Sequence, residues 1–323
     1  MNKYAITLIV LACVTSMVRF GHVYPDSYAY LSYIDYFDGV GSLEDVSTPM
    51  ALRPVLPLVV SLLNGLLDSF LILSILNLGF VSLIGLGMFR YVKNYYLDER
   101  SAFLAAAICT VSFPVAFYGA VPLVDALAVL IMLLVVIGQI EGKGDWFAMS
   151  LLLFGVIVKE VVLFIGLYYV LREIDESRSE SDLKTAFLVG VKKLWILLPA
   201  SILHLALRFL IFGELANSLG FHLRIFESLL RMIQVAGGIG ITFVLPITIL
   251  LITFRREKCQ SWGIAKRDAL LGFVSLLPLA FLGLFFAYFD ARFIWPLYLP
   301  LLPMIGCSIR VLTDQTGQDE RII

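Results

Sequence analysis

The chain has 323 residues, of which 60% are hydrophobic and only 15% are charged. Its mean hydropathy of +0.93 excludes a soluble globular protein and predicts a polytopic α-helical membrane protein. The net charge of −1 gives no indication of nucleic-acid binding. The cysteines lie in apolar runs or basic loops, so we expect packing thiols and neither disulfides nor a metal cluster; they are Cys13, Cys109, Cys259 and Cys307.

The first apolar run, residues 4–20, resembles a signal peptide over Met1 to Ser16, but we expect it to stay as an uncleaved helix because the later spans already require membrane insertion. A spanning helix needs about 20 apolar residues. Eight runs meet this requirement, near residues 4–20, 69–91, 101–120, 122–140, 192–212, 237–254, 269–289 and 293–311.

Two stretches are ambiguous. Residues 54–67 are too short to cross and carry two prolines at their start, which predicts a re-entrant or interfacial helix. Residues 146–172 form one long apolar run that is interrupted by Lys159-Glu160. If this run crosses the membrane once, the basic loop 255–268 is outside; if it crosses twice, turning at Lys159-Glu160, that loop is inside.

The positive-inside rule favours the double crossing, because all but seven of the 24 Lys and Arg then lie on or near the cytoplasmic side. We therefore expect one integral-membrane domain, 1–323, with about ten spans, both termini in the cytoplasm and a location in the plasma membrane. Its loops are an outer loop with juxtamembrane helices at 21–68, cytoplasmic loops at 173–190 and 255–268, and an outer amphipathic helix at 213–236.

The seven exceptions are Arg19, Arg53, Lys159, Arg208, Arg224, Arg231 and Arg292. Arg224 and Arg231 share a helical face with Glu227 and fit the outer amphipathic helix. Arg53, Lys159 and Arg292 each sit where an apolar segment starts or breaks. A buried cation needs an anion, which either the protein or a ligand supplies.

The outer loop opens with a candidate catalytic acid. Pro25 and the polar pair Asp26-Ser27 predict a helix start, with the helix continuing to Phe37. Asp26 either caps this helix or accepts a proton from a substrate at the membrane surface, and the two roles are compatible. Tyr30 and Tyr33 follow at helical spacing and also fit an aromatic belt. The remaining acids of the loop are interpreted as solvated: Asp35, Asp38, Glu44 and Asp45.

Five short patterns occur in order along the chain. They are Asp26-Ser27-Tyr28-Ala29-Tyr30, Arg53-Pro54-Val55-Leu56-Pro57-Leu58, Pro122-Leu123-Val124-Asp125-Ala126-Leu127-Ala128, Gly155-Val156-Ile157-Val158-Lys159-Glu160 and Ala291-Arg292-Phe293-Ile294-Trp295-Pro296-Leu297. In these patterns the chain resembles, over most of its length, the integral-membrane glycosyltransferases of the GT-C fold, including protein O-mannosyltransferases and lipid A aminoarabinose transferases. It departs from them in having Ser27 where some branches carry a second acid, and in lacking a soluble outer domain.

The resemblance implies inverting transfer of a sugar from a polyprenyl-phosphate donor to a hydroxyl of a glycan, lipid or protein, at the outer face of the membrane. Asp26 would be the general base, and Arg53, Lys159 and Arg292 would hold the leaving phosphate. Asp125 would orient acceptor or sugar, or pair with one of the cations. No cofactor is implied, and the resemblance leaves dependence on a divalent metal open.

His204 and Arg208, one helical turn apart, are candidates for the outer cavity; otherwise they are packed polar residues with internal partners. Tyr30 is a candidate for substrate binding. Two other functional classes remain open. A multi-pass transporter also places charges inside spans, but typically shows repeated halves with broken helices, and no internal repeat is apparent. A non-catalytic scaffold or lipid-handling protein accounts for the hydrophobicity but gives Asp26 and the three cations no shared role.

Overall fold

The structure is a computed structural model that describes residues 3–47, 49–95, 97–180, 182–213, 240, 243–252, 260–286, 292 and 295–319. Within these ranges the chain is helical and contains no β-strand, so the predicted all-α class is confirmed. The α-helices are α1 (Lys3–Ser16), α2 (Pro25–Phe37), α3 (Val55–Leu63), α4 (Ser69–Lys93), α5 (Glu99–Thr110), α6 (Phe113–Tyr118), α7 (Asp125–Ile140), α8 (Asp145–Val158), α9 (Leu163–Glu180), α10 (Leu183–Lys193), α11 (Leu198–Phe212), α13 (Gln260–Phe286) and α14 (Tyr298–Asp319). A further short apolar helix spans Phe243–Ile252. Turns of 3₁₀ helix lie at Met17–Arg19, Leu43–Asp45, Met50–Leu52, Glu160–Val162, Leu194–Ile196 and Trp295–Leu297.

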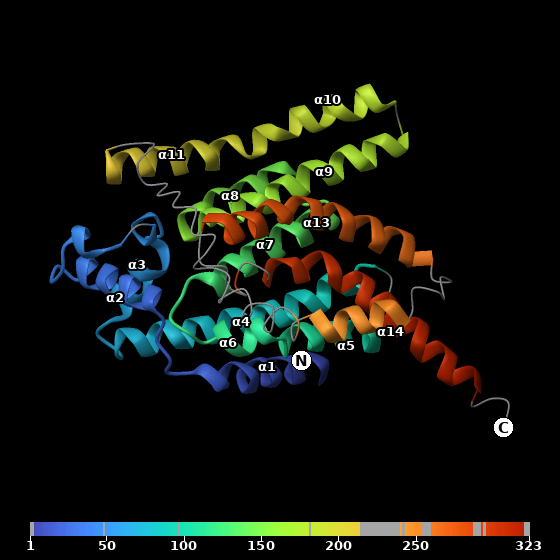
Figure 1. The fold of residues 1–323 in the computed structure, drawn as a ribbon, viewed down its shortest axis with the longest axis horizontal. Helices are drawn as coiled ribbons and strands as arrows, with labels where there is room; N and C mark the ends of the chain where they lie inside the picture. Colours follow the sequence, from blue (N-terminus) through green and yellow to red (C-terminus); the bar gives the residue numbers. More distant parts are fainter. Residues whose placement is uncertain are drawn as a thin grey trace.

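Most of the long helices lie side by side along the longest axis of the molecule, and α2 and α3 gather at one end (Figure 1). Helix α4 packs against α1, α5 and α7, while α9 packs against both α10 and α13. Helix α14 packs against α5 and α13. Helix α7 is buried over nearly its whole length, and its sequence accordingly carries no charged residue after Asp125.

Two helical segments of the described chain are long and apolar enough to cross a membrane, Ser69–Lys93 and Trp295–Thr313. A third span results if Leu183–Ile196 and Leu198–Phe212, which meet at an angle of 41°, are taken together. The apolar helices α1, α7 and α8 are shorter. These helices are consistent with a helical membrane protein. The two or three candidate spans among the described residues do not confirm the predicted number of about ten.

Three predicted segments differ from the observed elements. The apolar run 101–120 is divided into two helices, because α5 ends at Thr110 and α6 begins at Phe113. Pro114 lies in the first turn of α6, where a proline is tolerated, whereas it would interrupt one continuous helix. The predicted loop 173–190 is largely helical: α9 continues to Glu180, and Asp182 caps α10 by accepting a hydrogen bond from the Thr185 amide (3.1 Å). Of the predicted loop 255–268, residues from Gln260 onward belong to α13.

The predicted break at Lys159-Glu160 is present. Helix α8 ends at Val158, Lys159 has extended backbone angles (φ −165°, ψ 125°), and one 3₁₀ turn leads into α9. Helix α9 then runs back alongside α8, since the Tyr169 hydroxyl donates to Asp145 Oδ1 at the start of α8 (2.8 Å). The segment predicted to be re-entrant or interfacial contains α3, which at nine residues is too short to cross a bilayer. The predicted amphipathic helix 213–236 lies outside the described residues beyond Gly213.

Candidate active site

The candidate base Asp26 lies in the first turn of α2. Pro25 occupies the start of this helix, and its entry is closed by Tyr24 and Ser27: the Tyr24 amide donates to Ser27 Oγ (3.1 Å), and the Ser27 amide donates to the Tyr24 carbonyl (2.9 Å). Ser27 is fully buried, whereas the Asp26 side chain is 29% exposed. The predicted helix start is thus confirmed, and the cap is made by Ser27, which leaves the Asp26 carboxylate directed elsewhere.

A second acid, Asp125, lies in the first turn of α7. The loop before it is held by Asn77 of α4, whose side-chain amide donates to the carbonyls of Val121 (2.6 Å) and Leu123 (2.8 Å). Two hydrogen bonds from one buried amide fix the loop, and therefore the position of the Asp125 carboxylate. A carboxylate is also favoured there by the positive end of the α7 dipole.

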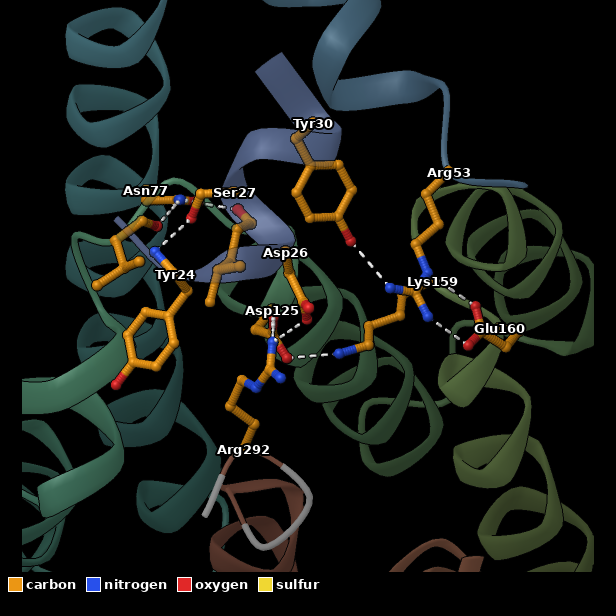
Figure 2. A network of polar contacts seen from close by, with 12 residues as sticks. Tyr24, Asp26, Ser27, Tyr30, Arg53, Asn77, Asp125, Lys159, Glu160 and Arg292 are labelled. Carbon is orange, nitrogen blue, oxygen red and sulfur yellow. Dashed lines mark hydrogen bonds and ion pairs between the residues drawn. The ribbon is translucent and has the colours of Figure 1, made fainter. Parts of the chain in front are cut away.

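Lys159 reaches Asp125 from the break after α8. Its Nζ lies 2.5 Å from Asp125 Oδ1, and both side chains are more than 90% buried. Arg292 lies 2.8 Å from Asp26 Oδ2 and 3.9 Å from Asp125 Oδ2, both through Nη1. Arg292 therefore connects the two carboxylates, and Asp26, Arg292, Asp125 and Lys159 form a continuous chain of opposite charges (Figure 2).

Arg53 lies beside this chain and makes a two-pronged contact with Glu160. Its Nε lies 3.0 Å from Glu160 Oε2 and its Nη2 lies 2.6 Å from Oε1, while Nη1 donates to the Tyr30 hydroxyl oxygen (2.9 Å). Burial raises the pKa of the Tyr30 phenol to about 12, although Arg53 acts in the opposite direction, so the phenol stays neutral. Tyr30 thus fixes the orientation of Arg53 without adding charge.

The structure therefore brings together six of the eight residues that the sequence indicates for the site: Asp26, Tyr30, Arg53, Asp125, Lys159 and Arg292 (Figure 2). The other two, His204 and Arg208, lie on α11, and His204 interacts electrostatically with Glu160 and Arg53. His204 therefore borders the cluster from the side of Glu160, and it also interacts electrostatically with Arg208. Between Asp125, Lys159 and Arg292 a cavity of about 10 Å³ remains, which is room for about one water molecule.

Sequence reasoning missed Glu160 and Asn77 as parts of this arrangement. Glu160 adjoins Lys159 in the same helix break, and an acid inside an apolar run is a signal that it needs a cationic partner. Asn77 lies within the long apolar helix α4, where a buried amide must find hydrogen-bond partners. The outer acids Asp35, Asp38, Glu44 and Asp45 are exposed, although Asp35 lies within α2 and Asp45 accepts a hydrogen bond from the Ser42 amide. Asp38 accepts hydrogen bonds from Ser61 and Asn64 and so joins α2 to the end of α3.

In the ranges that the structure covers, no group of three or more His, Cys, Asp or Glu side chains is arranged to hold a metal ion. Neither the scan against protein-family models nor the search of curated proteins finds a match to this chain. Function is therefore inferred from the chemistry of the cluster and from the sequence patterns on which its residues lie.

Proposed function

We propose that this protein is a membrane glycosyltransferase that moves a sugar from a polyprenyl-phosphate donor to an acceptor hydroxyl, with inversion at the anomeric carbon. One observation carries the proposal. An acid at the start of α2 shares one buried cluster with three cations from three separate segments, Arg53, Lys159 and Arg292. All four lie on the patterns in which the chain resembles GT-C glycosyltransferases.

The reaction needs a base and a cationic phosphate site close together. Asp26 accepts the proton of the acceptor hydroxyl while the hydroxyl oxygen attacks the anomeric carbon from the face opposite the phosphate. The new oxygen–carbon bond forms as the bond between the anomeric carbon and the phosphate oxygen breaks. The electron pair leaves with the polyprenyl phosphate, and the cations stabilise its charge.

The other residues of the cluster have supporting roles. Tyr30 and Glu160 orient the Arg53 guanidinium. Of the two roles open for Asp125, its short contact with Lys159 favours pairing with that cation (2.5 Å). The cavity beside Asp125 holds about one water molecule, so a sugar phosphate that binds there needs Asp125, Lys159 or Arg292 to move.

The topology belongs to the same proposal: about ten spans, both termini in the cytoplasm, and the cluster near the outer face of the plasma membrane, as the distribution of Lys and Arg favours. In a chain from which the four native cysteines are removed, Glu44→Cys should react only with an impermeant reagent added outside. Lys184→Cys should react only after the cytoplasmic side is opened. The reverse pattern would put Asp26 on the wrong face and contradict the topology.

The base assignment is tested with Asp26→Asn, which keeps the size of the side chain but cannot accept the proton. Transfer from a polyprenyl-phosphate sugar should fall by roughly 10²-fold or more, with an unchanged thermal melt, because Ser27 rather than Asp26 closes the helix entry. Glu44→Gln, which changes an exposed acid in the same loop, is the matched control and should keep full activity. Undiminished transfer by Asp26→Asn would reject Asp26 as the base, and a wild-type protein without any transfer would favour the transporter or scaffold alternative.

A further inference from the structure

Each of the three cations proposed to hold phosphate is already bonded to a carboxylate. Arg53 pairs with Glu160, Lys159 with Asp125, and Arg292 with Asp26. The cluster therefore contains three positive and three negative side chains, and its formal charges cancel. A phosphate group that enters must compete with a carboxylate for at least one of these cations.

The three pairs differ in how firmly they are held. Arg53 contacts Glu160 through two nitrogens and is fixed by Tyr30 through a third. Lys159 and Asp125 are only 8% and 6% exposed, so separating them would leave buried charges with poor solvation. Arg292 contacts Asp26 through one nitrogen, which also lies 3.9 Å from Asp125 Oδ2, and the Arg292 and Asp26 side chains are 15% and 29% exposed. The Arg292–Asp26 pair has fewer contacts between its partners than Arg53–Glu160 and is more exposed than Lys159–Asp125, so Asp26 is the carboxylate that a phosphate displaces most readily.

We propose that an entering phosphate ester displaces Asp26 from Arg292, and that this exchange of a carboxylate for a phosphate releases the base for catalysis. The proposal rests on the function proposed above and adds the order of events within the site. Arginine suits the exchange because its planar fork binds two phosphate oxygens at once, whereas it contacts Asp26 through a single oxygen in this structure.

The exchange has two consequences for the site. In the pair, Asp26 Oδ2 accepts a hydrogen bond from Arg292, and loss of this bond leaves both carboxylate oxygens of Asp26 open to an acceptor hydroxyl. Moving Arg292 toward a phosphate also shifts one wall of the 10 Å³ cavity, which Asp125, Lys159 and Arg292 line together with apolar side chains. The base is therefore coupled to the donor: it becomes available when a phosphate has taken its partner.

The test measures binding rather than turnover, so that it stands apart from the base assignment. Farnesyl phosphate and inorganic phosphate are titrated separately into the purified full-length protein in detergent. Asp26→Asn should bind farnesyl phosphate more tightly than the wild type, on the order of fivefold, because the phosphate no longer competes with a carboxylate for Arg292. Asp26→Ala is a second variant that removes the same competing carboxylate, for use if Asp26→Asn does not fold.

A double-mutant cycle with Arg292→Gln separates the exchange from a general loss of negative charge. In the Arg292→Gln background, Asp26→Asn should no longer tighten binding. An equal gain in both backgrounds, or no gain in either, would overturn the exchange. A gain for farnesyl phosphate alone supports exchange with a lipid-borne phosphate, and a gain for both probes supports exchange with phosphate from either source. An Asp26→Asn protein that binds more tightly yet retains transfer would reject the base assignment while leaving the exchange supported.

Discussion

At the scale of single residues, the burial of a charged side chain affects its contribution to stability more than its residue type does. Arg53 and Arg90 both make two-pronged contacts with a glutamate, Arg53 with Glu160 and Arg90 with Glu141. The Arg53 side chain is 7% exposed and is also fixed by Tyr30, whereas the Arg90 side chain is 62% exposed. The same chemical pair is therefore expected to contribute more to stability at Arg53 than at Arg90, whose arginine is exposed to solvent.

We predict that Arg53→Lys lowers both stability and sugar transfer, since an ammonium cannot keep the two contacts with Glu160 and the contact with Tyr30 together. The expected loss is about 1–3 kcal/mol in the free energy of unfolding, measured by thermal melting in detergent. Arg90→Lys makes the same change in a pair whose arginine is 62% exposed, and it should cost no more than about 1 kcal/mol. Equal effects of the two substitutions would contradict the role assigned to burial.

At the scale of elements, the turn between α8 and α9 positions two residues of the cluster, Lys159 and Glu160. The turn is tightly packed: a Cβ atom on Gly155 would lie 2.5 Å from Val162 Cγ1 and 3.1 Å from Ile131 Cγ2. Val162 is β-branched and fully buried, so it has little freedom to move away. The 3₁₀ turn approaches the end of α8 so closely at Gly155 that only a residue without a Cβ atom fits there.

Gly155→Ala should consequently destabilise the protein by about 1–3 kcal/mol and reduce transfer, because the displaced turn carries Lys159 away from Asp125. Gly79 offers a matched control, since it is exposed in α4 and a Cβ atom added there would meet no other atom within 4 Å. Gly79→Ala should be neutral or stabilising by about 0.5–1 kcal/mol, because alanine favours a helix interior. Thermal melts and a transfer assay on both variants test this prediction. Unchanged stability and transfer in Gly155→Ala would show that the 3₁₀ turn can move to accommodate a Cβ atom.

At the scale of the whole molecule, a second polar cluster joins helices that are far apart in sequence. Asp268 of α13 is 2% exposed, accepts a hydrogen bond from the Tyr95 hydroxyl just beyond α4, and lies 3.8 Å from Arg172 Nε of α9. Arg172 also pairs with Glu176 in its own helix (2.9 Å). This cluster ties α4, α9 and α13 together near the C-terminal end of α4, whereas the candidate site lies toward its N-terminal part.

Asp268→Ala is expected to lower the free energy of unfolding by about 2–3 kcal/mol, because Tyr95 and Arg172 lose a buried acceptor. Farnesyl phosphate affinity of the folded protein should stay unchanged, since the substitution leaves the residues around Asp26 intact. Glu44→Ala, at an exposed acid of the outer loop, is the control for stability. A change in phosphate affinity without loss of stability would mean that the two clusters are coupled.

Several features follow from the sequence alone because they depend on neighbouring residues. The all-helical class follows from the long apolar runs, the start of α2 from Pro25 and Ser27, and the break at Lys159-Glu160 from two charges within an apolar stretch. The need of Arg53, Lys159 and Arg292 for anionic partners follows equally from their apolar surroundings.

Only the tertiary structure decided which anions these are. Arg53 and Glu160 are 107 positions apart, and Arg292 and Asp26 are 266 positions apart, so their pairing depends on how the helices pack. Packing likewise selected Asn77 to hold the loop before Asp125. Local patterns determine where a helix starts and which side chains need a partner, but the choice of partner is made by contacts between helices, which no short stretch of sequence contains.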